Sequence, residues 1–243
     1  MKKAFFSFHR TIPVFGAVLL AVVLLVACNK KDAVTTRIPA SGLMVFNLAP
    51  DKDGIGVALS GNLLNNNPLS YTSFNGNYQN IYTGTRNIES FDLTDSVFAS
   101  STFTFEDNNL YSLFVTGYNG VYKNITVKDD VDSNATADKA YIRYINAIPD
   151  SSAPVVSITA GGTEVAGEAA SFTSVSNFIP VAGGDVKITV NNGSTISTDR
   201  LVSLENGKVY TALLIGVPGA TDDTRKVQIR YVLNGSVPVE SGK

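Results

Sequence analysis

A short block of this 243-residue sequence occurs twice. Residues 45–51 read Val-Phe-Asn-Leu-Ala-Pro-Asp, and residues 144–150, 99 positions later, read Tyr-Ile-Asn-Ala-Ile-Pro-Asp. The same offset relates residues 106–111 to residues 205–210. Two separated blocks that keep one offset indicate an internal duplication, and they predict two domains of the same fold.

The pattern of apolar residues within each copy predicts β-strands. Short runs with two-residue alternation, such as residues 103–105 and 186–190, are separated by Asn-Gly pairs. Asn-Gly favours tight turns whose central residues need positive φ. Since no stretch has the period of an amphipathic helix, we expect an all-β protein with two tandem antiparallel Greek-key β-sandwiches, immunoglobulin-like or transthyretin-like.

The domain boundaries follow from composition. We expect a signal peptide at 1–27, a polar tether at 28–41, sandwiches at 42–128 and 139–234, and a tail at 235–243. Residues 129–138 are charged and poor in apolar side chains, and we interpret them as the linker. Each sandwich then has about 100 residues, enough for one hydrophobic core without disulfides.

The N-terminus predicts export and lipidation. A basic segment precedes an apolar run that ends Leu-Val-Ala-Cys at residues 25–28, and the run is too short and too closely followed by charge to span a membrane. This ending resembles the bacterial lipobox, which implies cleavage between Ala27 and Cys28 and lipid attachment at Cys28. Several acyl chains on one cysteine would anchor the protein stably. Asn29 after the cysteine favours the outer membrane, and outward exposure is slightly favoured over exposure to the periplasm.

Composition excludes several kinds of chemistry. The only histidine, His9, and the only cysteine, Cys28, lie in or at the end of the signal, so the mature body lacks the usual nucleophile pairs and zinc, haem or iron-sulfur ligands. We therefore expect no catalytic residue, no cofactor and no resident metal. Because the mature chain carries 16 basic and 21 acidic side chains, we do not expect nucleic acid as a partner.

Two tyrosines have matching positions in the copies. Tyr111 and Tyr210 each open a predicted strand just after a turn. Greek-key sandwiches place a tyrosine at such a corner, with its ring in the core and its hydroxyl bonded to nearby backbone. We interpret both residues as structural.

The second copy resembles a known family. Residues 141–150, the segment Gly-Gly-Asp-Val-Lys-Ile-Thr-Val at 183–190, and Leu-Glu-Asn-Gly-Lys-Val-Tyr-Thr at 204–211 resemble the cell-envelope family called domain of unknown function 4397. The first copy departs more, with Asn-Asn-Leu-Tyr-Ser at 108–112. The resemblance implies a secreted or surface-anchored β-sandwich, and it implies no activity or catalytic residues.

The stretch between Gly61 and Gly84 is the candidate ligand site. Aromatic rings stack on sugars and Asn amides bond to hydroxyls, so this composition suits a glycan. In the alternative, the rings are core or edge residues and the asparagines form turns. The candidate residues are Asn65, Asn66, Tyr71, Phe74, Tyr78 and Tyr82.

Two weaker patterns complete the candidates. Aspartates near residues 51–53, 129–132 and 222–223 offer oxygen ligands for calcium, but none has EF-hand spacing, and turn formation with no metal is the favoured interpretation. Asp95-Ser96-Val97 resembles a short O-glycosylation motif, with Ser96 as the acceptor, against the alternative of an ordinary polar loop.

Together these patterns predict a non-catalytic, lipid-anchored envelope protein of a Gram-negative bacterium. It would act as a surface binding or structural module, and a polysaccharide or an envelope protein is the expected partner where it binds. A fimbrial or adhesin subunit is the first alternative, in which residues 234–243 or the tether would supply a donor strand. A periplasmic scaffold is the second alternative.

Overall fold

The computed structural model describes residues 37–150 and 152–237; the predicted cleavage site at Ala27 and Cys28 lies outside them. Both repeats belong to one compact unit of the chain. Every regular element among the described residues is a β-strand. Among those residues no helix has the length and apolar character needed to cross a membrane. The prediction of an all-β fold is confirmed.

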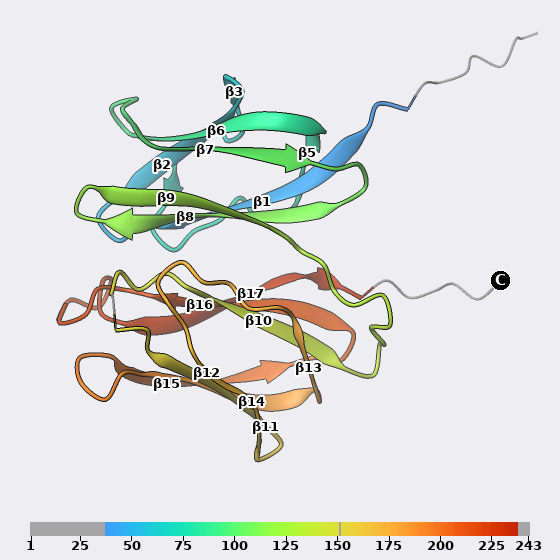
Figure 1. Cartoon of the computed structure of the whole chain (residues 1–243), viewed down its shortest axis with the longest axis vertical. Helices are drawn as coiled ribbons and strands as arrows, with labels where there is room; N and C mark the ends of the chain where they lie inside the picture. Colours follow the sequence, from blue (N-terminus) through green and yellow to red (C-terminus); the bar gives the residue numbers. More distant parts are fainter. Residues whose placement is uncertain (1–36, 151, 238–243) are drawn as a thin grey trace, which may run out of the picture. The chain divides into compact units, whose positions relative to one another are not determined.

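The first repeat contains two sheets (Figure 1). The sheet with the order β5-β1-β8-β9 is called inner sheet 1, and the sheet with the order β3-β2-β6-β7, to which β4 is added beside β2, is called outer sheet 1. The strands are β1 (Ala40–Leu48), β2 (Gly54–Leu59), β3 (Asn62–Leu63), β4 (Leu69–Ser70), β5 (Gln79–Tyr82), β6 (Gly84–Asp92), β7 (Val97–Phe105), β8 (Leu110–Tyr118) and β9 (Val121–Lys128).

The second repeat has the same arrangement. Inner sheet 2 has the order β13-β10-β16-β17, and outer sheet 2 has the order β12-β11-β14-β15. The strands are β10 (Ala140–Asn146), β11 (Val155–Ala160), β12 (Thr163–Ala169), β13 (Ile179–Val181), β14 (Gly184–Asn191), β15 (Ser197–Leu204), β16 (Lys208–Ile215) and β17 (Gln228–Ser236).

The register of the inner sheets repeats the offset seen in the sequence. Val45 lies opposite Leu113 in one repeat, and Tyr144 lies opposite Ala212 in the other. Both pairings, β1 with β8 and β10 with β16, are parallel, whereas the other strand pairs are antiparallel. The two inner sheets are therefore mixed, whereas the outer sheets are antiparallel. Parallel pairing is possible because the paired strands are joined by long crossovers through the outer sheets.

The central strands of the inner sheets are buried on both faces. From Ser41 to Leu48 every residue of β1 is buried, and all of β10 is buried. Alternate residues of β1 serve different layers: Leu43 and Val45 join the core of the first sandwich, whereas Met44 and Phe46 join a cluster with Ile145 and Leu213 of the second repeat. We call this layer between the two inner sheets the seam. Burial on both faces explains why these strands are continuous apolar runs.

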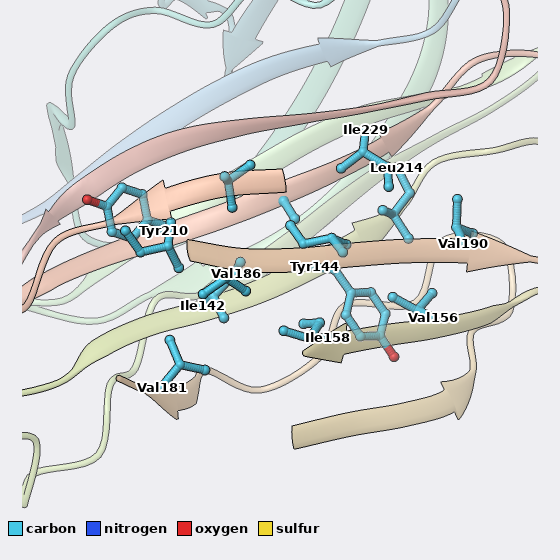
Figure 2. Close-up of a cluster of buried hydrophobic side chains, with 14 of the residues drawn as sticks. Ile142, Tyr144, Val156, Ile158, Val181, Val186, Val190, Tyr210, Leu214 and Ile229 are labelled. Atoms are coloured by element: carbon cyan, nitrogen blue, oxygen red, sulfur yellow. The ribbon is translucent and has the colours of Figure 1, made fainter. Parts of the chain in front are cut away.

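The core of the second sandwich lies between its own inner and outer sheets. Figure 2 shows Ile142 and Tyr144 of β10 with Val156 and Ile158 of β11. These side chains belong to one buried cluster with residues of β14 and β16. A contiguous cluster of this kind supplies most of the favourable free energy of folding of a sandwich.

Four of the five Asn-Gly pairs lie in connections between strands, and one does not. Asn119 and Gly120 both have positive φ and connect β8 to β9 as expected. Asn234 and Gly235 form an Asn-Gly pair as well, but the prediction of a turn there is wrong, because both residues lie inside β17 at a register shift opposite Val209 and Tyr210. Such a bulge turns the side chain of Asn234 into the structure, where it is buried. Strand β17 consequently continues to Ser236, beyond the expected end of the second sandwich.

Candidate functional site

The candidate aromatic residues do not form one platform. Tyr71, Phe74 and Tyr78 pack against the seam, where the ring of Phe74 stacks on that of Phe46 with centroids 5.4 Å apart. Tyr82, at the end of β5, is 65% exposed and takes no part in that cluster. Only Tyr82 among the four therefore offers an open ring to a ligand.

The two candidate asparagines also differ. Asn65 Oδ1 accepts a hydrogen bond from the backbone N–H of Val57 at 3.0 Å, and its Nδ2 donates to the carbonyl of Ile55 at 3.2 Å. The amide side chain thus occupies the edge of β2 as a neighbouring strand would, which is a structural role. Asn66 is exposed.

The seam contains a buried ion pair that sequence analysis missed. Arg143 Nη2 lies 2.5 Å from Asp129 Oδ1, and the two side chains are 2% and 3% exposed. Arg143 belongs to β10, and Asp129 directly follows β9, at the start of the segment expected to be a solvated linker. A buried charge pair is stable only when further hydrogen bonds satisfy its remaining polar atoms.

Side chains of the first repeat supply several of those hydrogen bonds. Ser112 of β8 accepts from Arg143 Nη2 at 2.9 Å and donates to Asp129 Oδ2 at 2.7 Å. Tyr78 donates to the same Oδ2 at 2.5 Å. Burial and the neighbouring carboxylate raise the pKa of Tyr78, so its hydroxyl stays protonated and donates. The carboxylate of Asp129 is thereby fully engaged.

The network continues into the second repeat. Arg143 Nε donates to the hydroxyl of Thr211 at 3.1 Å, and Thr211 donates to Asn234 Oδ1 at 2.7 Å. The guanidinium carbon of Arg143 also lies 4.5 Å from the ring centroid of Phe178, within the range of a cation-π contact. Polar bonds and apolar packing thus join the repeats in one seam.

A groove lies where the edges of inner sheet 1 and outer sheet 1 approach each other. It has a volume of about 390 Å³ and lies between Tyr82 and Asn80 of β5 and Asn62 and Leu63 of β3. The corresponding edge of outer sheet 2 is the seven-residue β12, whereas here β3 and β4 have two residues each. The short edge strand of the first repeat leaves the groove open.

The lining of this groove combines apolar and amide groups. Leu59, Leu64 and Ile81 contribute apolar surface, and Arg86 contributes a guanidinium of which one nitrogen donates to the carbonyl of Thr83 at 2.9 Å. With the exposed ring of Tyr82 and the amide of Asn80, these groups match the apolar face and the hydroxyls of a sugar. The groove is the candidate binding site of the first repeat.

The acidic loops use their carboxylates internally. Asp51 Oδ2 accepts from the backbone N–H of Asn119 at 2.8 Å and from the hydroxyl of Tyr122 at 2.6 Å. Burial, together with the bond to Asp51, raises the pKa of Tyr122 to about 12. Asp222 accepts from Thr224 and from the backbone of Arg225, and the bond from Thr224 is the main cause of its lowered pKa. Within residues 37–150 and 152–237 no group of three His, Cys, Asp or Glu side chains is placed to hold a metal.

The remaining candidates occupy turns and corners. Ser96 is exposed in the turn between β6 and β7, where its backbone N–H donates to Asp92 Oδ1 at 3.3 Å. The hydroxyl of Tyr111 accepts from the backbone N–H of Glu106 at 3.0 Å, and that of Tyr210 accepts from Glu205 at 3.2 Å. These two hydroxyls tie the same corner in each repeat.

The fold and the seam define a class of protein, a tandem pair of β-sandwiches packed through their inner sheets. The chain belongs to the family described as domain of unknown function (DUF4397), which matches twice, over residues 41–153 and 140–230. The two matches agree with the duplication in the sequence. No curated protein matches the chain.

Proposed function

We propose that this protein is a lipid-anchored cell-envelope protein of a Gram-negative bacterium and that its double sandwich acts, without catalysis, as a surface binding module. The observation that carries the proposal is the sequence Leu-Val-Ala-Cys at residues 25–28, placed twelve residues before the first strand begins at Ala40. A lipid on Cys28 would hold the body near a membrane by a short polar tether.

The groove beside Tyr82 supports binding as the role of the body. It joins an open aromatic ring to amide and guanidinium groups, and the mature chain has no histidine and no cysteine after position 28. Sugars of a surface polysaccharide are the ligands that this lining suits best. Most of the lining comes from the stretch between Gly61 and Gly84 that the sequence indicates.

Anchoring and orientation are tested in cells. Intact cells are treated with a protease too large to cross the outer membrane, and the protein is followed by blot beside a Cys28→Ser strain. We expect digestion of the anchored protein from outside and release of the variant into soluble fractions. Protection until the outer membrane is broken would instead favour the periplasmic scaffold.

Binding is tested with Tyr82→Ala in the soluble mature chain. Native gels cast with neutral polysaccharides should retard the unsubstituted protein and not this variant, since stacking on an aromatic ring contributes most when the ring is open. Leu93→Ala is the matched control, because Leu93 is 63% exposed and does not line the groove. Equal retardation of both variants would exclude the groove as the site.

Part of the donor strand that the fimbrial alternative requires is already paired within this chain. Gly235 and Ser236 pair with β16 of their own chain, and Asn234 lies at the bulge between them and Leu233, so these residues are not free to complete another subunit. Residues 238–243 and most of the tether lie outside the described residues. Ladders of linked subunits on unboiled gels would support this alternative over a monomeric module.

A further inference from the structure

A second cavity lies between the two repeats, on the Asp51 side of the seam. It has a volume of about 580 Å³. Its walls are formed by Pro50, Asp51, Asp53, Ser70, Tyr71 and Thr72 of the first repeat and by Thr224, Arg225 and Arg230 of the second. Cavities of this size bury small-molecule ligands. Because both repeats contribute walls, neither sandwich could form this cavity alone.

Two guanidinium groups of the second repeat line the cavity. Arg225 is held by Asp222, with its Nε 3.1 Å from Oδ2. Arg230 is held through Nε by Gln228 at 3.1 Å and through Nη1 by the hydroxyl of Thr72 at 2.7 Å. Among the described residues no bond occupies either terminal nitrogen of Arg225 or Nη2 of Arg230. Positioned guanidinium groups with unused N–H donors favour a carboxylate, which they bind with fork geometry.

The opposite wall supplies hydrogen-bond acceptors. Asp51 and Asp53 both line the cavity. Asp51 Oδ1 is buried and has no hydrogen-bond donor among the described residues, although Oδ2 of the same carboxylate has two. A buried acceptor without a donor is costly, and a ligand or water that supplies the donor relieves that cost.

These walls exclude simple ions. The two carboxylates repel an inorganic anion, and the two guanidinium groups repel a metal cation. A ligand that carries one carboxylate and several hydroxyls satisfies both walls, since the acid meets the arginines and the hydroxyls donate to the aspartates. We propose that this cavity binds a uronic acid unit of an acidic polysaccharide.

The proposal goes beyond the neutral-sugar groove and involves different residues. It is tested with the mature chain carrying Cys28→Ser, by native electrophoresis in gels that contain polygalacturonate, alginate or neutral dextran. We expect retardation by at least one acidic polymer that exceeds the retardation by dextran, to which only the groove beside Tyr82 contributes. Arg225→Gln and Arg230→Gln should each weaken that retardation about tenfold, the effect of losing a charge-assisted hydrogen bond.

Lys226→Gln is the matched control. Lys226 lies next to Arg225, is similarly exposed and pairs with Asp223, but it does not line the cavity. This variant removes the same charge and should bind as the unsubstituted chain does. An equal loss of retardation in Lys226→Gln would show that binding depends only on the overall charge of the protein, and it would overturn the proposal.

Three further results of these gels would decide whether the proposal holds. Absence of retardation by both acidic polymers overturns the site, and equal retardation by dextran overturns recognition of the carboxylate. Tyr82→Ala should leave binding to the acidic polymer unchanged, which separates this cavity from the groove of the first repeat. A negative result for this cavity would not bear on the proposals of lipid anchoring and of binding in the groove, because neither depends on Arg225 or Arg230.

Discussion

Arg143 and Asp129 form a buried ion pair across the boundary between the repeats, with Nη2 and Oδ1 2.5 Å apart. Arg143 lies in the first strand of the second repeat, and Asp129 directly follows the last strand of the first. The pair therefore fixes the point at which the chain passes from one sandwich to the other.

Asp129→Asn should destabilise the protein by about 3–5 kcal/mol, because it leaves the charge of Arg143 buried without a counter-charge. Urea denaturation measures the loss. Asp130→Asn is the matched control, since Asp130 is exposed and its replacement should change the free energy of unfolding by less than about 0.5 kcal/mol.

The double variant Asp129→Asn with Arg143→Met separates coupling from simple loss of packing. Removing both charges should recover part of the stability lost in Asp129→Asn, as replacement of both members of a buried pair commonly does. Strictly additive losses from the two substitutions would show that the ion pair has no coupling energy.

The sequence predicts the repeats better than it predicts the seam. The duplicated block marks β1 and β10, and its Asn47 and Asn146 are buried and accept from the backbone two residues ahead in both repeats. The alternating runs at residues 103–105 and 186–190 predict strands and lie in β7 and β14. The apolar runs of β1 and β10 do not alternate, which indicates burial on both faces and hence a second packing layer.

The sequence does not predict the ion pair, because nothing in it relates Arg143 to Asp129. Arg143 interrupts an apolar strand, which signals a buried charge, but Asp129 stands in a run of aspartates typical of a solvated loop. Only tertiary packing brings them together. The same applies to Asn234, whose Asn-Gly context favours a turn while its buried bond with Thr211 favours a bulge.

Tyr111→Phe and Tyr210→Phe should each lower the free energy of unfolding by about 1 kcal/mol. Each substitution removes the acceptor of one backbone N–H, that of Glu106 or Glu205, while the ring continues to fill the core. Thermal and urea unfolding would measure the effect. Tyr82→Phe, at an exposed ring, should leave stability unchanged, and a similar loss in that control would refute the role of the corner bonds.

Stability should fall in alkaline solution between about pH 10 and pH 12. Burial raises the pKa of Tyr71 to about 12 in the folded protein, whereas an unfolded tyrosine titrates near pH 10. The folded state holds this proton more tightly than the unfolded state does. The contribution of Tyr71 to the free energy of unfolding is therefore complete below about pH 10, and it is lost as the pH rises through the pKa of the folded protein. Tyr78 adds to the effect in the same direction.

Urea midpoints measured across this pH range test the assignment. Tyr71→Phe cannot ionise and should show a shallower decline than the unsubstituted chain, with Tyr82→Phe as the exposed control. Parallel declines in all three proteins would assign the alkaline loss to other groups, such as the lysines.

Asn65→Ala should destabilise the first sandwich by about 1–3 kcal/mol. The substitution leaves the N–H of Val57 and the carbonyl of Ile55 without the amide that pairs with them at the edge of β2. Asn66→Ala is the matched control, because Asn66 is exposed next to it and none of its side-chain atoms bonds to a described residue. The free energy of unfolding in urea should separate the two variants.

Hydrogen exchange locates the same effect at one residue. The amide of Val57 should exchange faster in Asn65→Ala than in Asn66→Ala, since its acceptor is Asn65 Oδ1. Asn65→Asp keeps an acceptor for that amide but places a carboxylate oxygen against the carbonyl of Ile55, so it should protect the amide of Val57 and still lower stability. Slow exchange at Val57 in Asn65→Ala would mean that another acceptor replaces the side chain, and it would contradict the role of Asn65 at the edge of β2.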